Sequence, residues 1–152
     1  ALQRCAAEYW HEFAKSKIVS TKISIRPTFA LDSRGCYLGN TSYFFPATTD
    51  GRYVLGILNS RLFFAYAKKV FVEKQGGWFE VQPDALESFR IPTAPTEKQK
   101  AVERLVDRIL TTKQRDAEAD VSALEREIDQ LVYALYGLTP EEIKLIEDST
   151  QR

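Results

Sequence analysis

The sequence has few of the residues from which metal and disulfide sites are built. Its 152 residues include only two cysteines, Cys5 and Cys36, and a single histidine, His11. A structural zinc site takes four such ligands, and a disulfide framework takes several cysteine pairs. The counts therefore exclude the common zinc patterns and predict reduced, structural thiols, as is typical of a cytoplasmic protein. His11 has no serine or cysteine partner at motif spacing, so we assign it no catalytic role.

Long apolar runs are missing as well. No segment approaches the roughly 20 apolar residues that a transmembrane helix needs, and no signal-peptide pattern opens the chain. We therefore expect no membrane association. The chain lacks an initiator methionine, and Ala1 already lies within an amphipathic pattern, so we expect a segment of a longer protein. At this length a chain buries roughly 68–70% of its unfolded surface, enough for one hydrophobic core without cross-links.

Net charge is zero, but the charges are unevenly distributed along the chain. Residues 1–80 contain 11 Lys and Arg against 6 Asp and Glu, whereas residues 81–152 contain 10 against 15. The first part therefore carries +5 and the second −5. Between residues 15 and 40 the only acid is Asp32, and the bases are Lys15, Lys17, Lys22, Arg26 and Arg34. A local basic surface favours phosphate contact. The alternative is that these are ordinary solvated charges on strand faces.

The first part of the chain is predicted to be β-rich after a connecting helix. Apolar residues at helical spacing predict that helix over residues 2–15. β-Branched residues over 18–25 indicate a strand, which Arg26-Pro27 interrupts. A turn at residues 32–35 then leads into a hairpin strand at Tyr37 and Leu38. Aromatic residues over 42–47 predict a further strand, which Pro46 limits or places at a sheet edge.

One buried helix is expected next. Asp50 is a suitable cap, and residues 54–70 are apolar on more than one face, with Gly56 weakening the helix slightly. Gln75-Gly76-Gly77 predicts a turn, and residues 78–81 another short strand.

The last third is predicted to be helical. Thr96 to Gln99 matches a capping box at the start of a helix that ends near residue 115. After a break at 116–120, Asp120 caps a second helix over 121–136, and Gly137 suits the left-handed position that ends it. The apolar seam of this second helix is Val121, Leu124, Ile128, Leu131, Leu135 and Leu138. The two helices would form an antiparallel hairpin, and Thr139 with Pro140 would cap a short terminal helix.

The predicted fold is therefore α+β: a small β-rich module with a buried helix, then the helical hairpin and a short terminal helix. We place the boundary between a module over residues 1–95 and a helical part over residues 96–152 that packs on it.

Three blocks, in this order, resemble the C-terminal end of type IIG restriction-modification enzymes and related N6-adenine DNA methyltransferases. They are KIVSTKISIRPTFALDSRGCYLGNTSYFF from Lys17, YVLGILNSRLFFAYAKK from Tyr53, and IPTAPTEKQKAVERLVDRIL from Ile91, followed by LEREIDQLVYALYGLTPEEI from Leu124. In that family this portion is the target recognition domain, similar to the specificity subunits of type I restriction systems. The resemblance implies a DNA-reading module joined to long helices.

The resemblance also implies that the chemistry lies on other domains of the same polypeptide. Adenine methyltransferases of the family carry an Asn/Asp-Pro-Pro-aromatic motif, and no such tetrapeptide occurs here. No glycine-rich loop for S-adenosylmethionine is evident either. Pro83-Asp84 with Glu87 is similar to a metal-dependent nuclease pattern, but Phe89-Arg90 replaces its ending. We therefore expect no catalytic site or cofactor in this segment. The parent would use S-adenosylmethionine and, where a nuclease domain is present, Mg²⁺.

The predicted partner is double-stranded DNA, with the methyltransferase and nuclease domains as partners within the polypeptide. Arginine pairs naturally with guanine and asparagine with adenine, while lysine neutralises phosphates, and aromatic rings can stack on bases. The candidate DNA-binding residues are Lys17, Lys22, Arg26, Arg34, Tyr37 and Asn40. A competing hypothesis is a protein-interaction module whose helical hairpin docks a methyltransferase or restriction subunit.

Overall fold

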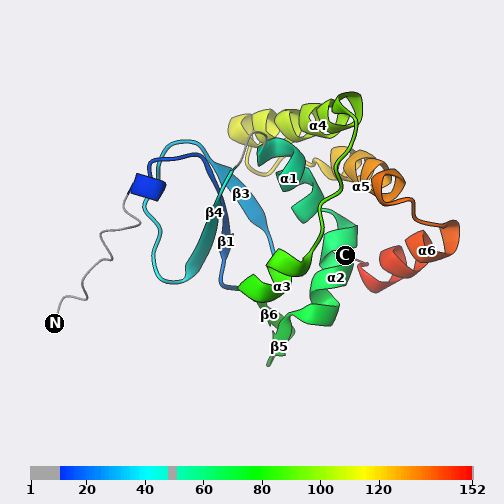
Figure 1. The fold of residues 1–152 in the computed structure, drawn as a ribbon, viewed down its shortest axis with the longest axis horizontal. Helices are drawn as coiled ribbons and strands as arrows, with labels where there is room; N and C mark the ends of the chain where they lie inside the picture. Colours follow the sequence, from blue (N-terminus) through cyan, green and yellow to red (C-terminus); the bar gives the residue numbers. More distant parts are fainter. Residues whose placement is uncertain (1–10, 48–50, 152) are drawn as a thin grey trace.

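The structure is a computed structural model that describes residues 11–47 and 51–151. The described residues form two small antiparallel sheets and six helices, confirming the α+β class (Figure 1). Among them no helix is long and apolar enough to cross a membrane.

The first sheet has the order β3-β1-β4. Its central strand is β1 (Lys17–Thr21), flanked by β3 (Phe29–Asp32) and β4 (Ser42–Pro46). Ile18 lies opposite both Leu31 and Phe45 and is buried, as expected for a β-branched residue at the centre of a sheet. Pro46 ends the edge strand β4, which confirms the predicted place of this proline.

The second sheet has the order β2-β6-β5, from β2 (Ile23–Ser24), β6 (Trp78–Glu80) and β5 (Val72–Lys74). The chain passes from one sheet to the other at Lys22, whose N–H donates to Thr41 and whose carbonyl accepts from Val81. Gly76 and Gly77 both have positive φ at the β5–β6 turn, as the predicted turn requires.

Two β-strand predictions were wrong. The segment 18–25 is not one strand, because it is divided between β1 and β2. Tyr37 and Leu38 form no strand, and residues 33–41 are instead a long loop between β3 and β4. The carboxylate of Asp32 accepts hydrogen bonds from the N–H groups of Arg34 and Cys36. These amides are therefore satisfied without a partner strand.

The predicted helix over residues 54–70 is two helices, α1 (Gly51–Leu58) and α2 (Arg61–Val70). The Asn59 side chain donates to the carbonyl of Phe29 and accepts from its N–H, both at 3.0 Å. The Ser60 hydroxyl accepts from Phe63 and caps α2. These side-chain bonds compete with the helical pattern and break it. Asp50, the predicted cap, lies outside the described residues.

The predicted connecting helix over residues 2–15 falls mostly on residues 1–10, outside the described part. Where it can be followed, the prediction was wrong: residues 11–15 form a short 3₁₀ turn and a bend rather than an α-helix. The N–H of Lys15 bonds to the carbonyl of Glu12, three residues back, at 3.2 Å.

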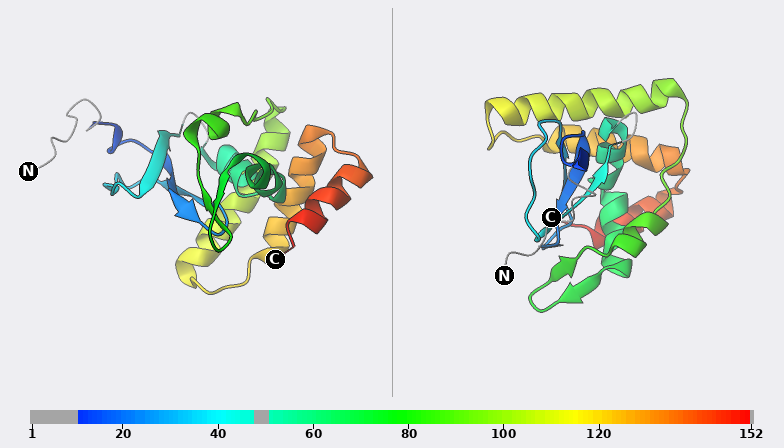
Figure 2. Two further views of the ribbon diagram at one scale, coloured as in Figure 1. Left: turned by 90° about the horizontal axis from the view of Figure 1, so that it is seen from below. Right: turned by 60° about the vertical axis from the view of Figure 1, so that its left-hand side comes forward.

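The remaining helices are α3 (Pro83–Ser88), α4 (Thr96–Arg115), α5 (Ser122–Tyr136) and α6 (Pro140–Ser149). α4 and α5 run antiparallel, which confirms the helical hairpin (Figures 1 and 2).

The capping signals of these helices were predicted with mixed success. Gly137 is left-handed with φ 65°, and Thr139 and Glu142 form a reciprocal capping box. Asp120 accepts from the N–H of Ser122 at 2.8 Å, but the N-cap position predicted for it is taken by Val121, which has no side-chain cap. The capping box predicted at Thr96 was wrong, because the helix already includes Thr96 and follows Pro95 without a side-chain cap.

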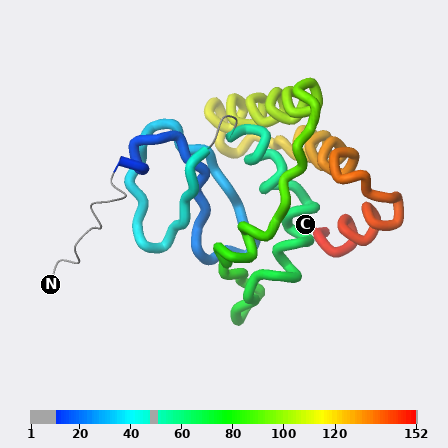
Figure 3. Tube along the Cα trace, in the orientation of Figure 1, coloured from blue at the N-terminus to red at the C-terminus, as the bar shows by residue number. Residues whose placement is uncertain are grey.

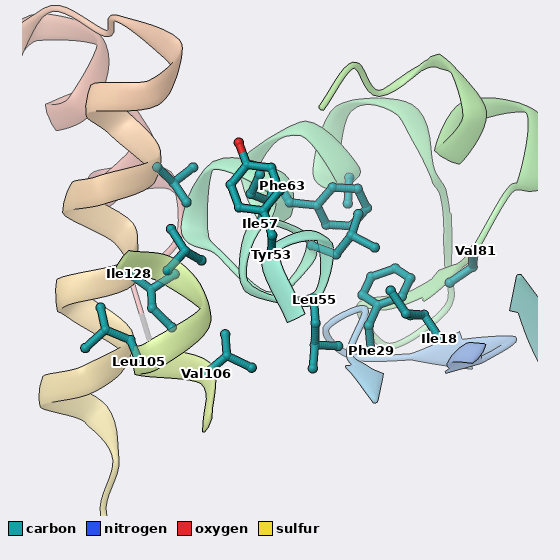
Figure 4. Packing of buried hydrophobic residues seen from close by; sticks show 14 of the residues in the cluster. Ile18, Phe29, Tyr53, Leu55, Ile57, Phe63, Val81, Leu105, Val106 and Ile128 are labelled. Atoms are coloured by element: carbon teal, nitrogen blue, oxygen red, sulfur yellow. The ribbon is translucent and has the colours of Figure 1, made fainter. Parts of the chain in front are cut away.

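One hydrophobic core lies around α1 (Figure 4). Sheet residues Ile18 and Phe29 meet it from one side, and Val106 of α4 and Ile128 of α5 from the other. Gly56 lies where α1 meets α4: an added Cβ would stand 2.6 Å from Val102 Cγ1. Glycine at this position therefore allows two backbones to approach closely, a role that goes beyond the slight weakening of the helix that the sequence predicted.

The buried face of α5 is rotated from the predicted seam. Val121 and Ile128 are buried, but Leu124, Leu131, Leu135 and Leu138 are only partly so. The most deeply buried α5 side chains are Val132 and Tyr133. α5 packs against α1, α2 and α4, so its buried face is wider than a two-helix seam.

Candidate nucleic-acid interface

The predicted DNA-binding residues occupy three different environments, of which the first is buried. The side chain of Lys17, in the central strand β1, is 0% exposed, and its ammonium pairs with Asp32, whose side chain is 9% exposed. It also donates to the Phe13 carbonyl at 2.7 Å. A charge enclosed in this way cannot reach a phosphate, so we leave Lys17 out of the proposed DNA-contacting surface.

Asp32 anchors the loop that follows β3. Its Oδ1 accepts from the N–H of Arg34 at 2.9 Å, and its Oδ2 accepts from the N–H of Cys36 at 2.8 Å and from Lys17. The Lys17 ammonium, helped by the two N–H groups, holds the pKa of the Asp32 carboxyl well below its usual range. The carboxylate is therefore charged throughout the physiological range.

The second environment is this loop, residues 33–41, which we call the reading loop. It lies at the end of the molecule away from α5 and α6, as the cyan part of the trace shows (Figure 3). The side chains of Arg34 and Asn40 are exposed, and Tyr37 is 66% exposed. The loop thus presents a guanidinium, a phenol and a carboxamide to solvent.

Tyr37 is supported from beneath. Its ring centroid lies 5.5 Å from that of Phe13, which in turn lies 4.9 Å from that of Phe44 in β4. These ring pairs connect the loop to the first sheet through side-chain packing. One face of Tyr37 therefore packs on protein while the residue stays mostly in contact with solvent.

Lys22 lies beside the return of the reading loop, because its N–H bonds to the carbonyl of Thr41 at 2.8 Å. Its ammonium is 5.9 Å from the centre of the Tyr43 ring and 3.9 Å from a carboxylate oxygen of Glu80. The side chain is 41% exposed, so this loose ion pair leaves the ammonium accessible to a phosphate.

The third environment holds Arg26, apart from the loop. Its guanidinium lies 5.0 Å from the centre of the Phe64 ring and donates to the Asn59 carbonyl at 3.1 Å. Lys68 of α2 lies 5.8 Å from the same ring. The reading loop crosses from the Lys17 end of the first sheet, beside Asp32, to the Thr21 end, beside Ser42. Arg34 therefore lies near one end of the sheet, Asn40 and Lys22 lie near the other, and Arg26 lies against the helices.

Beside Arg26 is a cavity of about 470 Å³ between β3, α1, α4 and α5. Its walls include apolar side chains such as Leu55 and Ile109. Asn59 and Ser60, which also line it, already hydrogen-bond to backbone groups. The described residues contain no group of three or more His, Cys, Asp and Glu that could hold a metal ion.

Sequence reasoning missed the two residues that organise the loop, Asp32 and Phe13. Asp32 was noted as the sole acid among bases and as the first residue of a predicted turn, but not as the residue that anchors the loop. That position was a usable signal, since one acid among several cations is a natural ion-pair partner. The contact of Phe13 with Tyr37 had no comparable signal, because it depends on how the loop folds back.

The described residues thus form a small mixed α/β module with an exposed loop that carries polar side chains. The family model of the TaqI-like C-terminal specificity domain matches residues 1–92 of the 152-residue chain, so the chain belongs to this family. The match confirms the resemblance to the C-terminal target recognition domain of type IIG restriction-modification enzymes. It supports a role in DNA target recognition, and a specificity domain is not itself catalytic. A comparison with curated proteins found no match.

Proposed function

We propose that this chain reads a specific sequence of duplex DNA with the reading loop. The observation that carries the proposal is the loop itself, which is fixed at its base by Asp32 while Arg34 and Asn40 extend into solvent. Base reading requires donors and acceptors presented at fixed positions, and a loop on a rigid scaffold meets this need.

The residue types suit this task. Arg34 can donate two hydrogen bonds to guanine, and Asn40 can both donate to and accept from adenine. Tyr37 offers a ring that can stack on a base or pack against the DNA backbone. Lys22, at the end of the same sheet, suits a phosphate contact that sets the register of the module on the duplex.

Within the parent enzyme, the module would position DNA for methylation of adenine N6 by a methyltransferase domain of the same polypeptide. That domain would use S-adenosylmethionine, and a nuclease domain, where present, would use Mg²⁺. Base flipping costs a few kcal/mol and needs contacts that hold the rest of the duplex. The reading loop and Lys22 would supply those contacts.

The test begins with a pool of duplexes with a randomised core, from which the chain should enrich one sequence. The enriched duplex and a scrambled version are then titrated at two salt concentrations. Arg34→Ala should cost about 1–3 kcal/mol on the enriched duplex and relax one position of the target. Lys22→Ala should lower the affinity for both duplexes to the same extent and reduce the slope of log affinity against log salt concentration by about 1.

Lys144→Ala provides the matched control, because Lys144 is an exposed lysine on α6, remote from the loop. It should leave the affinity and the salt slope unchanged. If Arg34→Ala and Lys22→Ala behaved like Lys144→Ala, DNA would not be read by this surface.

A second candidate function, docking of a catalytic domain, is favoured by an apolar surface on the second sheet. In the register of β2, β6 and β5, Ile23 and Val72 both lie opposite Glu80. Ile23 is 47%, Val72 46% and Trp78 44% exposed. Among the described residues, α4 and α5 carry no exposed large hydrophobic side chain, so the sheet suits docking better than the helical hairpin does. Ile23→Ser with Val72→Ser should weaken association with the methyltransferase domain without changing DNA selectivity.

A further inference from the structure

The enclosed ion pair beneath the reading loop calls for a physical explanation. Lys17 and Asp32 lie in the first sheet, opposite each other in neighbouring strands, with side chains 0% and 9% exposed. Replacing a buried ion pair by well-packed apolar side chains is often neutral or even stabilising. Stability alone therefore does not account for two charges at this position.

A carboxylate at position 32 can accept hydrogen bonds from the loop backbone, which an apolar side chain cannot do. Asp32 accepts the N–H groups of Arg34 and Cys36 at 2.9 and 2.8 Å, and these are the amides with which the loop leaves the sheet. Lys17 neutralises the carboxylate and is itself held by the carbonyl of Phe13 at 2.7 Å. The pair thus connects the rigid strand β1 to the first turn of the loop.

The same part of the loop is fixed from a second side. Gly35 has φ +73°, and a Cβ there would lie 3.4 Å from Ala14 Cα and 3.5 Å from the Phe13 carbonyl. The ring of Phe13 also packs on Tyr37 at 5.5 Å. The loop therefore packs against the turn at residues 13–14, and Lys17 donates a hydrogen bond to the same turn.

From these contacts we infer that Asp32 is a positioning residue for DNA recognition: held by Lys17, its carboxylate fixes the reading loop in the conformation that reads bases. This inference rests on the proposed function. Non-specific binding depends on phosphate contacts and tolerates a loop with many conformations. Base reading does not tolerate such a loop. A loop that is not fixed adopts the base-reading conformation for only a fraction of the time, and the apparent affinity for the target sequence falls by that fraction.

The decisive variant is Lys17→Met/Asp32→Leu. It removes both charges together, so no buried charge is left unpaired and the net charge of the chain stays the same. The N–H groups of Arg34 and Cys36 lose their acceptor. We expect their hydrogen exchange in the free protein to accelerate at least tenfold, and affinity for the enriched duplex to fall about tenfold, while affinity for the scrambled duplex is unchanged.

Two further variants separate positioning from a loss of stability. Lys17→Met/Asp32→Asn keeps one side-chain oxygen that can accept a loop amide, so it should recover part of the selectivity. Gly35→Ala leaves the ion pair in place but strains a left-handed backbone position, and it should lower selectivity as well. Val132→Ala is the control: it destabilises a buried site in α5, remote from the loop, and should leave the ratio of the two affinities unchanged.

The outcomes distinguish the two proposals. If the wild-type chain enriched no sequence from the pool, the proposed function would fail and this inference with it. If Lys17→Met/Asp32→Leu released the two amides but kept the wild-type ratio of affinities, the positioning role would be overturned while the proposed function stood. Unchanged exchange of the two amides in that variant would also overturn it, because the loop would then be held by other contacts.

Discussion

The helical layer and the reading loop are held in place by different kinds of force. α1, α4 and α5 meet through apolar side chains such as Val102, Val106 and Ile128, which exclude water from a shared core. The reading loop is fixed by hydrogen bonds to Asp32, by the ring contact of Phe13 with Tyr37 and by the close approach of Gly35 to residues 13–14, with its outer side chains in solvent. The first kind of contact provides stability through buried area, and the second provides geometry at a few points. Changes in the helical layer should therefore alter folding, and changes in the loop should alter recognition.

The largest effect is expected from a charge in the helical layer. Val132→Asp places a carboxylate at a side chain that is 0% exposed and should lower the free energy of unfolding by about 4 kcal/mol or more. Leu131→Asp, at a partly buried position, should cost less, and Glu127→Ala, at an exposed one, should be nearly neutral. Urea unfolding of the three variants measures this order. Equal costs at Val132 and Leu131 would contradict the rotated face of α5.

A second contrast applies the same substitution in both regions. Gly56→Ala puts a methyl group 2.6 Å from Val102 Cγ1, at the α1–α4 contact, and should cost about 1–3 kcal/mol despite the better helix propensity of alanine. Gly39→Ala in the reading loop meets no atom within 4 Å and should be neutral, or stabilising by up to about 1 kcal/mol. Thermal unfolding compares them. A neutral Gly56→Ala would mean that the two helices are not in close contact.

A third pair concerns two tyrosines of α5. The Tyr133 hydroxyl is buried and has no hydrogen-bond partner among the described residues, whereas the Tyr136 hydroxyl donates to the carbonyl of Arg90 at 2.8 Å. Tyr133→Phe removes an unsatisfied group and should be neutral or stabilising, while Tyr136→Phe should cost about 1 kcal/mol. The difference in the free energy of unfolding measured at neutral pH tests this contrast.

Tyr133 should also make the free energy of unfolding depend on pH in the alkaline range. Burial, followed by the nearby charges of Asp129 and Glu147, raises the pKa of Tyr133 to about 12. Because the unfolded chain ionises this group near pH 10, the folded state holds its proton longer, and its contribution to stability is lost as pH rises from about 10 to 12. The slope is on the order of 1.4 kcal/mol per pH unit. Burial also raises the pKa of Tyr53 and Tyr136, so these residues add to the loss of stability in the same window. Tyr133→Phe should therefore reduce the slope without abolishing it, and a profile identical to wild type would contradict the assignment.

The smallest effect on stability is expected in the reading loop. Arg34→Ala removes an exposed side chain and should change the free energy of unfolding by less than about 0.5 kcal/mol. Its effect on DNA selectivity, proposed above, should be larger than this. If Arg34→Ala lowered the free energy of unfolding as much as it lowered the free energy of selective binding, the loop would contribute to stability as well as to recognition, which would contradict this contrast between the two regions.

Local signals in the sequence were enough to predict the C-terminal elements. α5 begins and ends, and α6 begins, close to where expected, because Asp120, Gly137 and the Thr139–Glu142 capping box act over three residues or fewer. The break between α1 and α2 was not predicted. Ser60 is a recognisable cap, but the bonds that hold Asn59 there reach Phe29, 30 residues away in the sequence.

The sequence by itself determined the α+β class, the helical hairpin, and a first part that is basic and resembles a recognition domain. These follow from periodicity, capping residues and charge counts, all of which act within one element or sum along the chain. Only the tertiary structure decided which basic side chains face solvent. Lys17 and Arg34 look equivalent in the sequence, but pairing of β1 with β3 places Lys17 opposite Asp32, inside the fold, and leaves Arg34 outside on the loop. Strand register is set by long-range packing, and it decides which face of the sheet each side chain occupies.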